Sequence, residues 1–365
     1  MYIFAGGGTG GHLIPALAIA EELLRLEPRA QVSFACSDRD IDRRILAPTG
    51  YAFVPQPIRP LPRGPRGWWG FLSSWVRAGR LARDMVKDLK PAAVLGLGGF
   101  AAAPVTKAAS KAGVRTALMS IDAVPGVANR FLAGKVETIF AQFESSRAAY
   151  RAHGCKVRVV GCPVRQQLLQ ADRAEALRFF GLREDRQTLL VVAGSLGAAS
   201  INRVVAALRV DIDRLAEGWQ VLHVSGPGKL EDVQAAYRGS GMTHAVLEFC
   251  DRMDLAYAAA DLVLCRAGAA TAGELMATGR PAVLMPYPYH RDQHQRHNAQ
   301  ALVEAGAARV VRDEIDPAGN ADTLRLSLLE LMTEPERLAA MKEAASRLRQ
   351  PGAAEAIARW MLVKT

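Results

Sequence analysis

The sequence predicts an α/β protein with two doubly wound domains, each a parallel sheet covered by helices. Short β-branched runs alternate with longer alanine-rich helical patterns throughout the 365 residues. A strand, a glycine-rich turn and a helix occupy residues 4–23, and a second unit of this kind begins at Leu189. This repeat favours two Rossmann-like domains that bind ligands in the cleft between them.

The first glycine-rich turn predicts an anion site. Five glycines fall within residues 6–11, and an apolar-periodic helix follows them. Glycines let backbone amides approach a ligand, and a helix N-terminus directs partial positive charge at it. We therefore expect a diphosphate here, with His12 as a candidate for proton transfer near neutral pH. The alternative is that His12 only hydrogen-bonds the loop.

Candidate phosphate and sugar ligands follow in the second half. Residues 159–165 end a strand in a turn with glycine and proline and mark the expected domain boundary, which places Arg165 at the cleft as a phosphate contact or an ordinary surface arginine. Glu274, early in the helix after strand 261–265, suits a ribose, although a helix-dipole partner is the alternative. The histidine-rich cluster 290–298 lacks the HExxH spacing and predicts a polar loop that binds a sugar.

The composition narrows the function classes. A formal net charge of +10 attracts phosphorylated substrates, anionic lipid or nucleic acid. No zinc knuckle, recognition-helix pattern or aromatic RNA-binding motif accompanies the charge, so nucleic acid ranks last. The five scattered cysteines form no CxxC pair, which argues against a disulfide framework and against a zinc site. With no signal peptide and no apolar run of transmembrane length, a cytoplasmic protein is expected.

A tryptophan-rich segment at 63–77 predicts contact with an anionic membrane surface. It contains three of the five tryptophans. Tryptophan and arginine together suit the headgroup region of a bilayer. A core-facing amphipathic helix is the alternative interpretation. The apolar candidates are Trp68, Trp69, Leu72, Trp75 and Val76, and the basic stripe that follows is Arg77, Arg80, Arg83 and Lys87.

Eight motifs, in order over nearly the whole chain, resemble the MurG family of glycosyltransferases. The opening motif and residues 266–279 are the most specific of them. The motifs are GGGTGGHLIPALAIAEEL (6–23), GGFAAAP (98–104), ANRFLA (128–133), GCPVR (161–165), GSLGAASIN (194–202), EFCDRM (248–253), CRAGAATAGELMATGRPAVLMPYP (265–288) and HQRHNAQALVEAGAA (294–308).

The resemblance implies a GT-B fold, in which residues 1–160 face the acceptor and the membrane and residues 165–345 bind the donor. The C-terminal helix, at about 350–365, would pack back on the first domain. The implied reaction is the metal-free, inverting transfer of GlcNAc from UDP-GlcNAc to the 4-hydroxyl of undecaprenyl-pyrophosphoryl-MurNAc-pentapeptide, which converts lipid I to lipid II in peptidoglycan biosynthesis. The implied location is the cytoplasmic face of the bacterial plasma membrane, as a peripheral protein.

The resemblance also implies roles for individual residues. His12 would be the general base that takes the proton of the acceptor hydroxyl. Acceptor contacts are expected at Thr9, Gly10, Gly11, Asp122 and Asn129. On the donor, the expected contacts are with the phosphates, the uracil, the ribose and the GlcNAc hydroxyls. These donor residues are Arg165, Gly194, Ser195, Cys250, Arg266, Glu274, His294, Gln295 and Asn298.

The chain departs from the family pattern mainly on the acceptor side. Residues 119–122 read Met-Ser-Ile-Asp where the family usually has His-Glu-Gln-Asn, and Phe100 and Ala102 replace residues that carry hydroxyls. The chain also differs from the usual family residue at three further positions, Cys162, Ala199 and Gln293. Two alternatives therefore stand beside the main hypothesis: a related UDP-sugar glycosyltransferase with a different acceptor, and a catalytically silent sugar-nucleotide-binding protein. A dinucleotide-dependent oxidoreductase ranks last.

Overall fold

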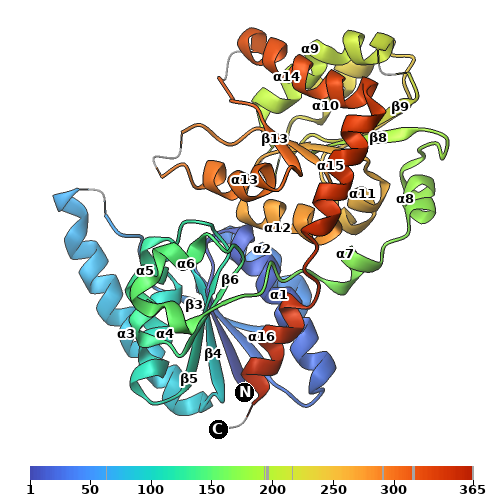
Figure 1. The fold of residues 1–365 in the computed structure, drawn as a ribbon. Coiled ribbons are helices and arrows are strands. Elements are labelled where there is room, and N and C mark those ends of the chain that lie inside the picture. Colours follow the sequence, from blue (N-terminus) through green and yellow to red (C-terminus); the bar gives the residue numbers. More distant parts are fainter. Residues whose placement is uncertain are drawn as a thin grey trace. The chain divides into compact units, whose positions relative to one another are not determined.

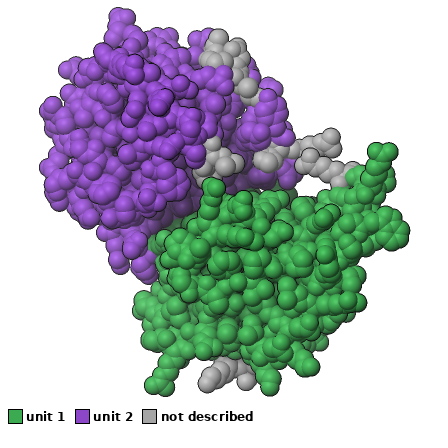
Figure 2. All heavy atoms as spheres, turned by 180° about the vertical axis from the view of Figure 1, so that it is seen from behind, with its two compact units in different colours: residues 1–165, 350–365 green, residues 166–349 purple. Residues whose placement is uncertain are grey.

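The computed structural model describes residues 1–62, 64–192, 194, 197–215, 217–289, 292–314 and 317–363. The chain divides into two compact units, which Figure 2 shows in different colours. Unit 1 consists of residues 1–165 and 350–365, and unit 2 consists of residues 166–349. Each unit has its own parallel sheet, so the predicted α/β class with two doubly wound domains is confirmed.

The sheet of unit 1 has seven strands among the described residues, in the order β3-β2-β1-β4-β5-β6-β7. All of its neighbouring strands pair in parallel. The order reverses at β1, so the carboxyl ends of β1 and β4 form the switch point where open α/β sheets bind ligands. The strands are β1 (Tyr2–Gly6), β2 (Val32–Ser37), β3 (Ala52–Gln56), β4 (Ala93–Gly98), β5 (Arg115–Ser120), β6 (Thr138–Ala141) and β7 (Val157–Val159).

Helices cover both faces of this sheet (Figure 1). Small side chains at the contacts, such as Ala82, Val105 and Ala109, let α3 and α4 pack closely on β1, β2 and β4. The helices are α1 (Gly10–Leu26), α2 (Asp40–Leu46), α3 (Trp68–Leu89), α4 (Ala102–Lys111), α5 (Val127–Leu132), α6 (Ser146–Ala149) and α16 (Ala353–Leu362), with 3-10 turns η1 (Ala47–Thr49), η2 (Pro65–Gly67), η3 (Ala133–Lys135) and η4 (Arg151–Lys156).

The C-terminal helix α16 belongs to unit 1, where it packs against α1 (Figure 1). Trp360 anchors it, with its ring edge-on to Phe140 at 5.7 Å between centroids. The guanidinium of Arg115 lies 4.3 Å from the centroid of the Trp360 ring, and its Nη1 donates to the carbonyl of Val363 at 2.6 Å. The end of the chain is thus fixed by aromatic and cation–π contacts.

The sheet of unit 2 has six strands among the described residues, in the order β10-β9-β8-β11-β12-β13. Apolar side chains of α9 and α14 pack against β8 and β11 in the core of this unit. The strands are β8 (Gln187–Val192), β9 (Trp219–Val224), β10 (His244–Leu247), β11 (Leu262–Cys265), β12 (Ala282–Leu284) and β13 (Ala308–Val310). The helices are α7 (Gln166–Gln170), α8 (Arg173–Phe180), α9 (Ala199–Leu215), α10 (Leu230–Tyr237), α11 (Met253–Ala259), α12 (Ala269–Thr278), α13 (His294–Glu304), α14 (Pro317–Thr333) and α15 (Pro335–Arg347).

Helix α3 combines a buried stripe with an exposed apolar end. Ala78, Ala82 and Met85 face the core, whereas Trp69 is 83% exposed. Trp75, predicted to share the outward face, is only partly exposed because its ring packs against Phe71 and Phe131. The core-facing alternative therefore holds for one face of this helix, and contact of its exposed apolar end with a membrane stays a prediction. No helix in the described ranges combines the length and apolar character that a bilayer span requires.

A fully buried carboxylate, Asp42 of α2, holds the first glycine turn. Both of its oxygens accept the backbone N–H of Gly8 at 2.8 Å. Its Oδ2 also accepts the backbone N–H and the hydroxyl of Ser37, at 2.9 and 2.6 Å. Gly7 is required beside it because a Cβ there would collide with the Asp42 carboxylate. The turn that positions α1 is thus tied to the end of β2.

The Asp42→Ala substitution should lower the free energy of unfolding by about 2–4 kcal/mol, because it leaves the buried N–H groups of Gly8 and Ser37 without an acceptor. Urea unfolding at neutral pH measures the change. Asp38→Ala, on the exposed side of the same connection, is the matched control and should change little. Equal effects of the two substitutions would contradict this assignment.

Candidate functional site

His12 lies in the first turn of α1, at the carboxyl edge of the sheet of unit 1. Thr9, the N-cap residue of α1, does not cap the helix with its side chain. Its Oγ1 instead lies 2.9 Å from Nδ1 of His12. When Nδ1 carries the proton and donates a hydrogen bond to Oγ1 of Thr9, the lone pair of Nε2 lies on the other side of the ring. This arrangement suits a base that acts through Nε2.

Gly98, at the end of β4, leaves open the space beside Nε2. A Cβ on Gly98 would lie 3.0 Å from Nε2 of His12 and 3.4 Å from Oδ1 of Asn129. Glycine at this position, with a φ of +96°, therefore keeps a gap that the histidine and the asparagine both face. A reacting hydroxyl would find a proton acceptor and a hydrogen-bond acceptor there.

Burial lowers the pKa of His12 below the ordinary value of imidazole, while the carboxylates of Asp122 and Asp42 act in the opposite direction. A lowered pKa keeps the ring neutral at pH 7, which a general base requires. The carboxylate of Asp122 would also stabilise an imidazolium if His12 accepted a proton.

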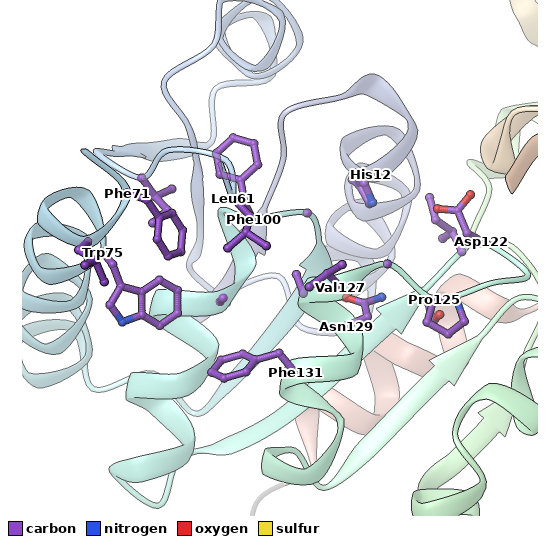
Figure 3. Close-up of a pocket in the computed structure, with 18 residues that line it drawn as sticks. His12, Leu61, Phe71, Trp75, Phe100, Asp122, Pro125, Val127, Asn129 and Phe131 are labelled. Atoms are coloured by element: carbon purple, nitrogen blue, oxygen red, sulfur yellow. The ribbon is translucent and has the colours of Figure 1, made fainter. Parts of the chain in front are cut away.

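A cavity of about 540 Å³ opens in front of His12 (Figure 3). His12, Ser120, Asp122 and Asn129 supply its polar lining. The remainder of the lining is largely apolar. The main apolar contributors are Ile58, Leu61, Phe71, Leu72, Trp75, Phe100, Val127 and Phe131. In Figure 3 the aromatic rings of Phe71 and Trp75 lie on the side of the cavity away from His12 and Asp122.

Asn129 brings an unpartnered oxygen into this cavity. The residue is only 7% exposed, and its Nδ2 donates to the carbonyl of Met119 at 3.1 Å. Its Oδ1 has no hydrogen-bond partner among the described residues. Ser120 is buried at the same end, where its hydroxyl accepts from Tyr150 at 3.1 Å. A buried acceptor without a partner is suited to a ligand donor.

In unit 2, Glu274 lies in the middle of α12. Burial raises its pKa to about 7, and the hydroxyl of Tyr257, which donates to Oε2 at 2.9 Å, opposes that rise. A half-buried carboxylate with one fixed hydrogen bond has acceptor capacity left for hydroxyls. Tyr257, on α11, thus fixes the orientation of the predicted ribose ligand.

Arg266, predicted at the donor, lies in a buried polar cluster. It pairs with Asp313 at 2.6 Å and donates to the hydroxyl of Ser200 at 2.9 Å. Its Nη1 donates to the carbonyl of Met285 at 2.8 Å. Asp313 is held in turn by Asn320 at 2.9 Å. The guanidinium therefore links the N-terminal part of α9 to the loops after β11 and β13.

Three predicted sugar contacts lie near the start of α13. The prediction of a polar loop at 290–298 is wrong from His294 onward, where the chain is helical. Gln293, at a φ of +44°, is the N-cap residue of this helix. His294 pairs with Asp292 at 2.9 Å, and Gln295 accepts the backbone N–H of Tyr287 at 2.8 Å. Asn298 is fully buried and points its amide toward the carbonyl of Ala267 at 3.4 Å.

The remaining predicted donor residues are spread over both units. Arg165 ends unit 1 and pairs with Glu21 of α1 at 3.1 Å. Gly194 adopts a φ of +82° ahead of α9, in the region that favours glycine. Cys250 is buried, which raises the pKa of its thiol to about 11. Ser195 lies outside the described residues.

Comparison with known proteins shows the family. Residues 2–141 match the glycosyltransferase family 28 N-terminal domain, and residues 188–357 match the family 28 C-terminal domain. A protein of Geobacter sulfurreducens named UDP-N-acetylglucosamine--N-acetylmuramyl-(pentapeptide) pyrophosphoryl-undecaprenol N-acetylglucosamine transferase is 36% identical over 369 residues, covering 100% of this chain and 98% of that protein. The chain belongs to the MurG family.

Further relatives agree with this membership. A protein of the same name from Leifsonia xyli subsp. xyli is 40% identical and is covered over 93% of its length, with 94% of this chain. The crystal structure of Acinetobacter baumannii MurG superimposes with a TM-score of 0.77 at 27% identity, covering 99% of both chains. The Neisseria meningitidis UDP-GlcNAc 2-epimerase, with a TM-score of 0.68 at 15% identity and full coverage of both chains, shows the shared fold alone.

Two residues of this MurG-family chain that matter to the site escaped sequence reasoning. Asp42 accepts from Gly8 across 34 positions, and Tyr257 donates to Glu274 across 17 positions. The one available signal for Asp42 is its spacing of four from Leu46, which puts a charged residue on the buried face of α2. Within the described ranges, no three His, Cys, Asp or Glu side chains come together in a way that could hold a metal ion.

The raised pKa of Glu274 predicts a pH-dependent stability. The folded state holds this proton more tightly than the unfolded chain, so the stabilising contribution is full near pH 4.5 and is lost as pH rises toward about 7. Relative to Glu274→Gln, the free energy of unfolding of the ligand-free protein should fall on the order of 2 kcal/mol over this range. Urea titrations at several pH values measure it.

Tyr257→Phe is the companion variant. Removing the hydrogen bond that favours the ionised carboxylate should move the midpoint of this pH dependence upward. Parallel pH curves for wild type and Glu274→Gln would contradict the assignment.

Proposed function

We propose that the chain is an inverting glycosyltransferase that moves GlcNAc from UDP-GlcNAc to the 4-hydroxyl of undecaprenyl-pyrophosphoryl-MurNAc-pentapeptide, forming lipid II for peptidoglycan biosynthesis. The observation that carries the proposal is the end-to-end similarity, at 36% identity, to a transferase named for this donor and this acceptor. A cavity with one polar and one apolar end supports an acceptor that joins a sugar to a lipid.

His12 is the proposed base. It takes the proton of the acceptor hydroxyl at Nε2 while that oxygen attacks the anomeric carbon and the bond to UDP breaks. Asp122 stabilises the imidazolium, and Oδ1 of Asn129 orients a donor group of the sugar. Of the amides in the glycine turn, that of Gly8 already serves Asp42. The acceptor diphosphate is therefore assigned to Thr9, Gly10 and Gly11, whose helix lacks a side-chain cap.

Unit 2 is the proposed donor domain. Glu274 accepts the ribose hydroxyls, the backbone at Cys250 meets the uracil, and the glycine turn at Gly194 and Ser195 approaches the diphosphate. Arg165, which belongs to unit 1, is the proposed source of a positive charge for the leaving group. His294, Gln295 and Asn298 shape the GlcNAc site, where Arg266 holds the surrounding loops together. Stabilising the departing UDP by amides and arginine requires no metal ion.

The proposed site of action is the cytoplasmic face of the bacterial plasma membrane. Trp68, Trp69, Leu72 and Val76 are exposed at one end of α3. A groove between α3 and α4 adds cations beside them. Its basic lining residues are Arg83, Lys87, Lys90, Lys107 and Lys111. Apolar side chains flanked by cations are suited to a surface of anionic lipid, with the protein bound peripherally.

Transfer of radiolabelled GlcNAc from UDP-GlcNAc to a short-chain lipid I analogue tests the proposed reaction. Product that forms equally with and without EDTA is expected. UDP-GlcNAc binding without product would indicate either a different acceptor or a silent binding protein, and trials with diacylglycerol and small glycoside acceptors separate those two. Absence of donor binding would contradict the proposal as a whole.

The His12→Ala substitution should lower kcat by about 10²–10⁴-fold with little change in the KM for UDP-GlcNAc, because a base contributes that much and the donor binds elsewhere. In wild type, kcat/KM should fall on the acid side with a midpoint below the ordinary pKa of histidine, since burial lowers the pKa of His12. Turnover within a few-fold of wild type would make His12 structural and Asp122 the next candidate.

Membrane attachment is tested by sedimentation with vesicles that contain phosphatidylglycerol. Trp69→Ala should weaken binding several-fold, because Trp69 is the most exposed of these apolar side chains. Phe179→Ala, an exposed aromatic residue on α8 of unit 2, is the control and should bind as wild type. Binding that is unaffected by Trp69→Ala and by high salt would contradict the assignment of this surface.

A further inference from the structure

The cavity in front of His12 has a largely apolar lining beside its few polar residues. His12, Asp122 and Asn129 lie toward one side of it, whereas the rings of Phe71, Trp75 and Phe131 lie on the other side (Figure 3). Phosphate and hydroxyl groups gain little from an apolar wall, because burying them without hydrogen bonds costs free energy. The apolar wall is therefore suited to an apolar part of the ligand, unlike the polar groups that fit the polar end.

We propose that the aromatic end of this cavity, between α3 and α5, binds the first isoprene units of the lipid acceptor, directly next to its diphosphate. The inference rests on the proposed function, since it needs an acceptor in which a hydrocarbon chain follows the diphosphate. It adds a site on unit 1 that recognises the hydrocarbon itself, before the chain enters the bilayer.

The side chains at this end form a connected aromatic wall. Trp75 lies 6.0 Å from Phe71 and 6.0 Å from Phe131 between ring centroids, and the second contact is edge-on. Phe131 is 41% exposed, so apolar area at this end is open to solvent in the free protein. An unsaturated branched chain would cover this area and gain hydrophobic stabilisation.

A cation at the glycine turn fits the diphosphate that precedes the hydrocarbon. The guanidinium of Arg39 lies 5.3 Å from the ring centroid of Phe100, which lines the cavity. Arg39 also donates to the carbonyl of Gly8 at 3.0 Å, which places its charge at the glycine turn. A ligand with adjacent negative and apolar parts matches this combination of side chains.

The wall also continues toward the proposed membrane surface. Leu72 lines the cavity and is 47% exposed on the same helix that carries Trp69. A chain leaving the cavity past Leu72 would therefore stay in contact with apolar side chains until it reaches the lipid. The cavity volume of about 540 Å³ is within the range of about 300–1,000 Å³ that ligand pockets occupy.

The test uses the full chain without detergent or vesicles, with water-soluble acceptors that differ only in the hydrocarbon. MurNAc-pentapeptide diphosphates carrying a methyl, a C5 prenyl or a C10 prenyl group are compared by initial rates at saturating UDP-GlcNAc. For wild type, the KM for the acceptor should fall at least about tenfold from methyl to C10, with kcat nearly constant, because each buried isoprene adds apolar contact.

Phe131→Ala should lose most of this dependence on chain length while its KM for UDP-GlcNAc stays that of wild type, which shows that the protein is folded. Val127→Ser, a change at an exposed apolar position that lines the same cavity, should lose part of this dependence on chain length. Phe179→Ala is the matched control and should keep the full dependence, since it lies on α8 of unit 2.

Two results would overturn the inference. One is a wild-type KM that does not depend on chain length, and the other is an equal loss for Phe131→Ala and Phe179→Ala. In both cases the acceptors would still be glycosylated and the proposed function would stand. Failure to glycosylate any of the three acceptors, the methyl diphosphate included, would contradict the proposed function itself.

Discussion

The hydrogen bonds of Asp42 are the constraint on which the acceptor side of this protein depends. A buried carboxylate needs strong donors, and Asp42 obtains them from the Gly8 amide and from Ser37 at the end of β2. The same bonds fix the glycine turn, which fixes the start of α1 and with it His12. The Asp42 carboxylate accepts from the Gly8 amide of the turn, and the first turn of α1 is the proposed site of the acceptor diphosphate.

The chemistry of unit 1 follows from one cavity with two unlike ends. Gly98 keeps a gap between His12 and Asn129, and the aromatic residues of α3 and α5 begin beyond it. A substrate that joins a sugar, a diphosphate and a hydrocarbon would satisfy both ends at once. Because α3 contributes both to the cavity wall and to the exposed apolar surface, the proposed acceptor site and the proposed membrane surface share one helix.

The fold was predictable because parallel strands buried on both faces appear as short apolar runs, and glycine-rich turns mark where helices begin. His12 and Glu274 were predicted as site residues for the same reason, since each lies close to a turn of this kind, and their roles stay predictions. Asp42 and Tyr257 were missed because their partners are distant in sequence. Helical spacing alone predicted that Trp75 faces outward, whereas in the structure its ring packs against Phe131 of α5.

The structure of the protein with a bound C10 prenyl analogue of the acceptor tests the account of unit 1 most directly. The account predicts the 4-hydroxyl of the sugar within about 3 Å of Nε2 of His12, the reach of a hydrogen bond to a general base. It also predicts the first isoprene unit against Trp75 and Phe131. An acceptor sugar away from His12, with the hydrocarbon outside the cavity, would contradict it.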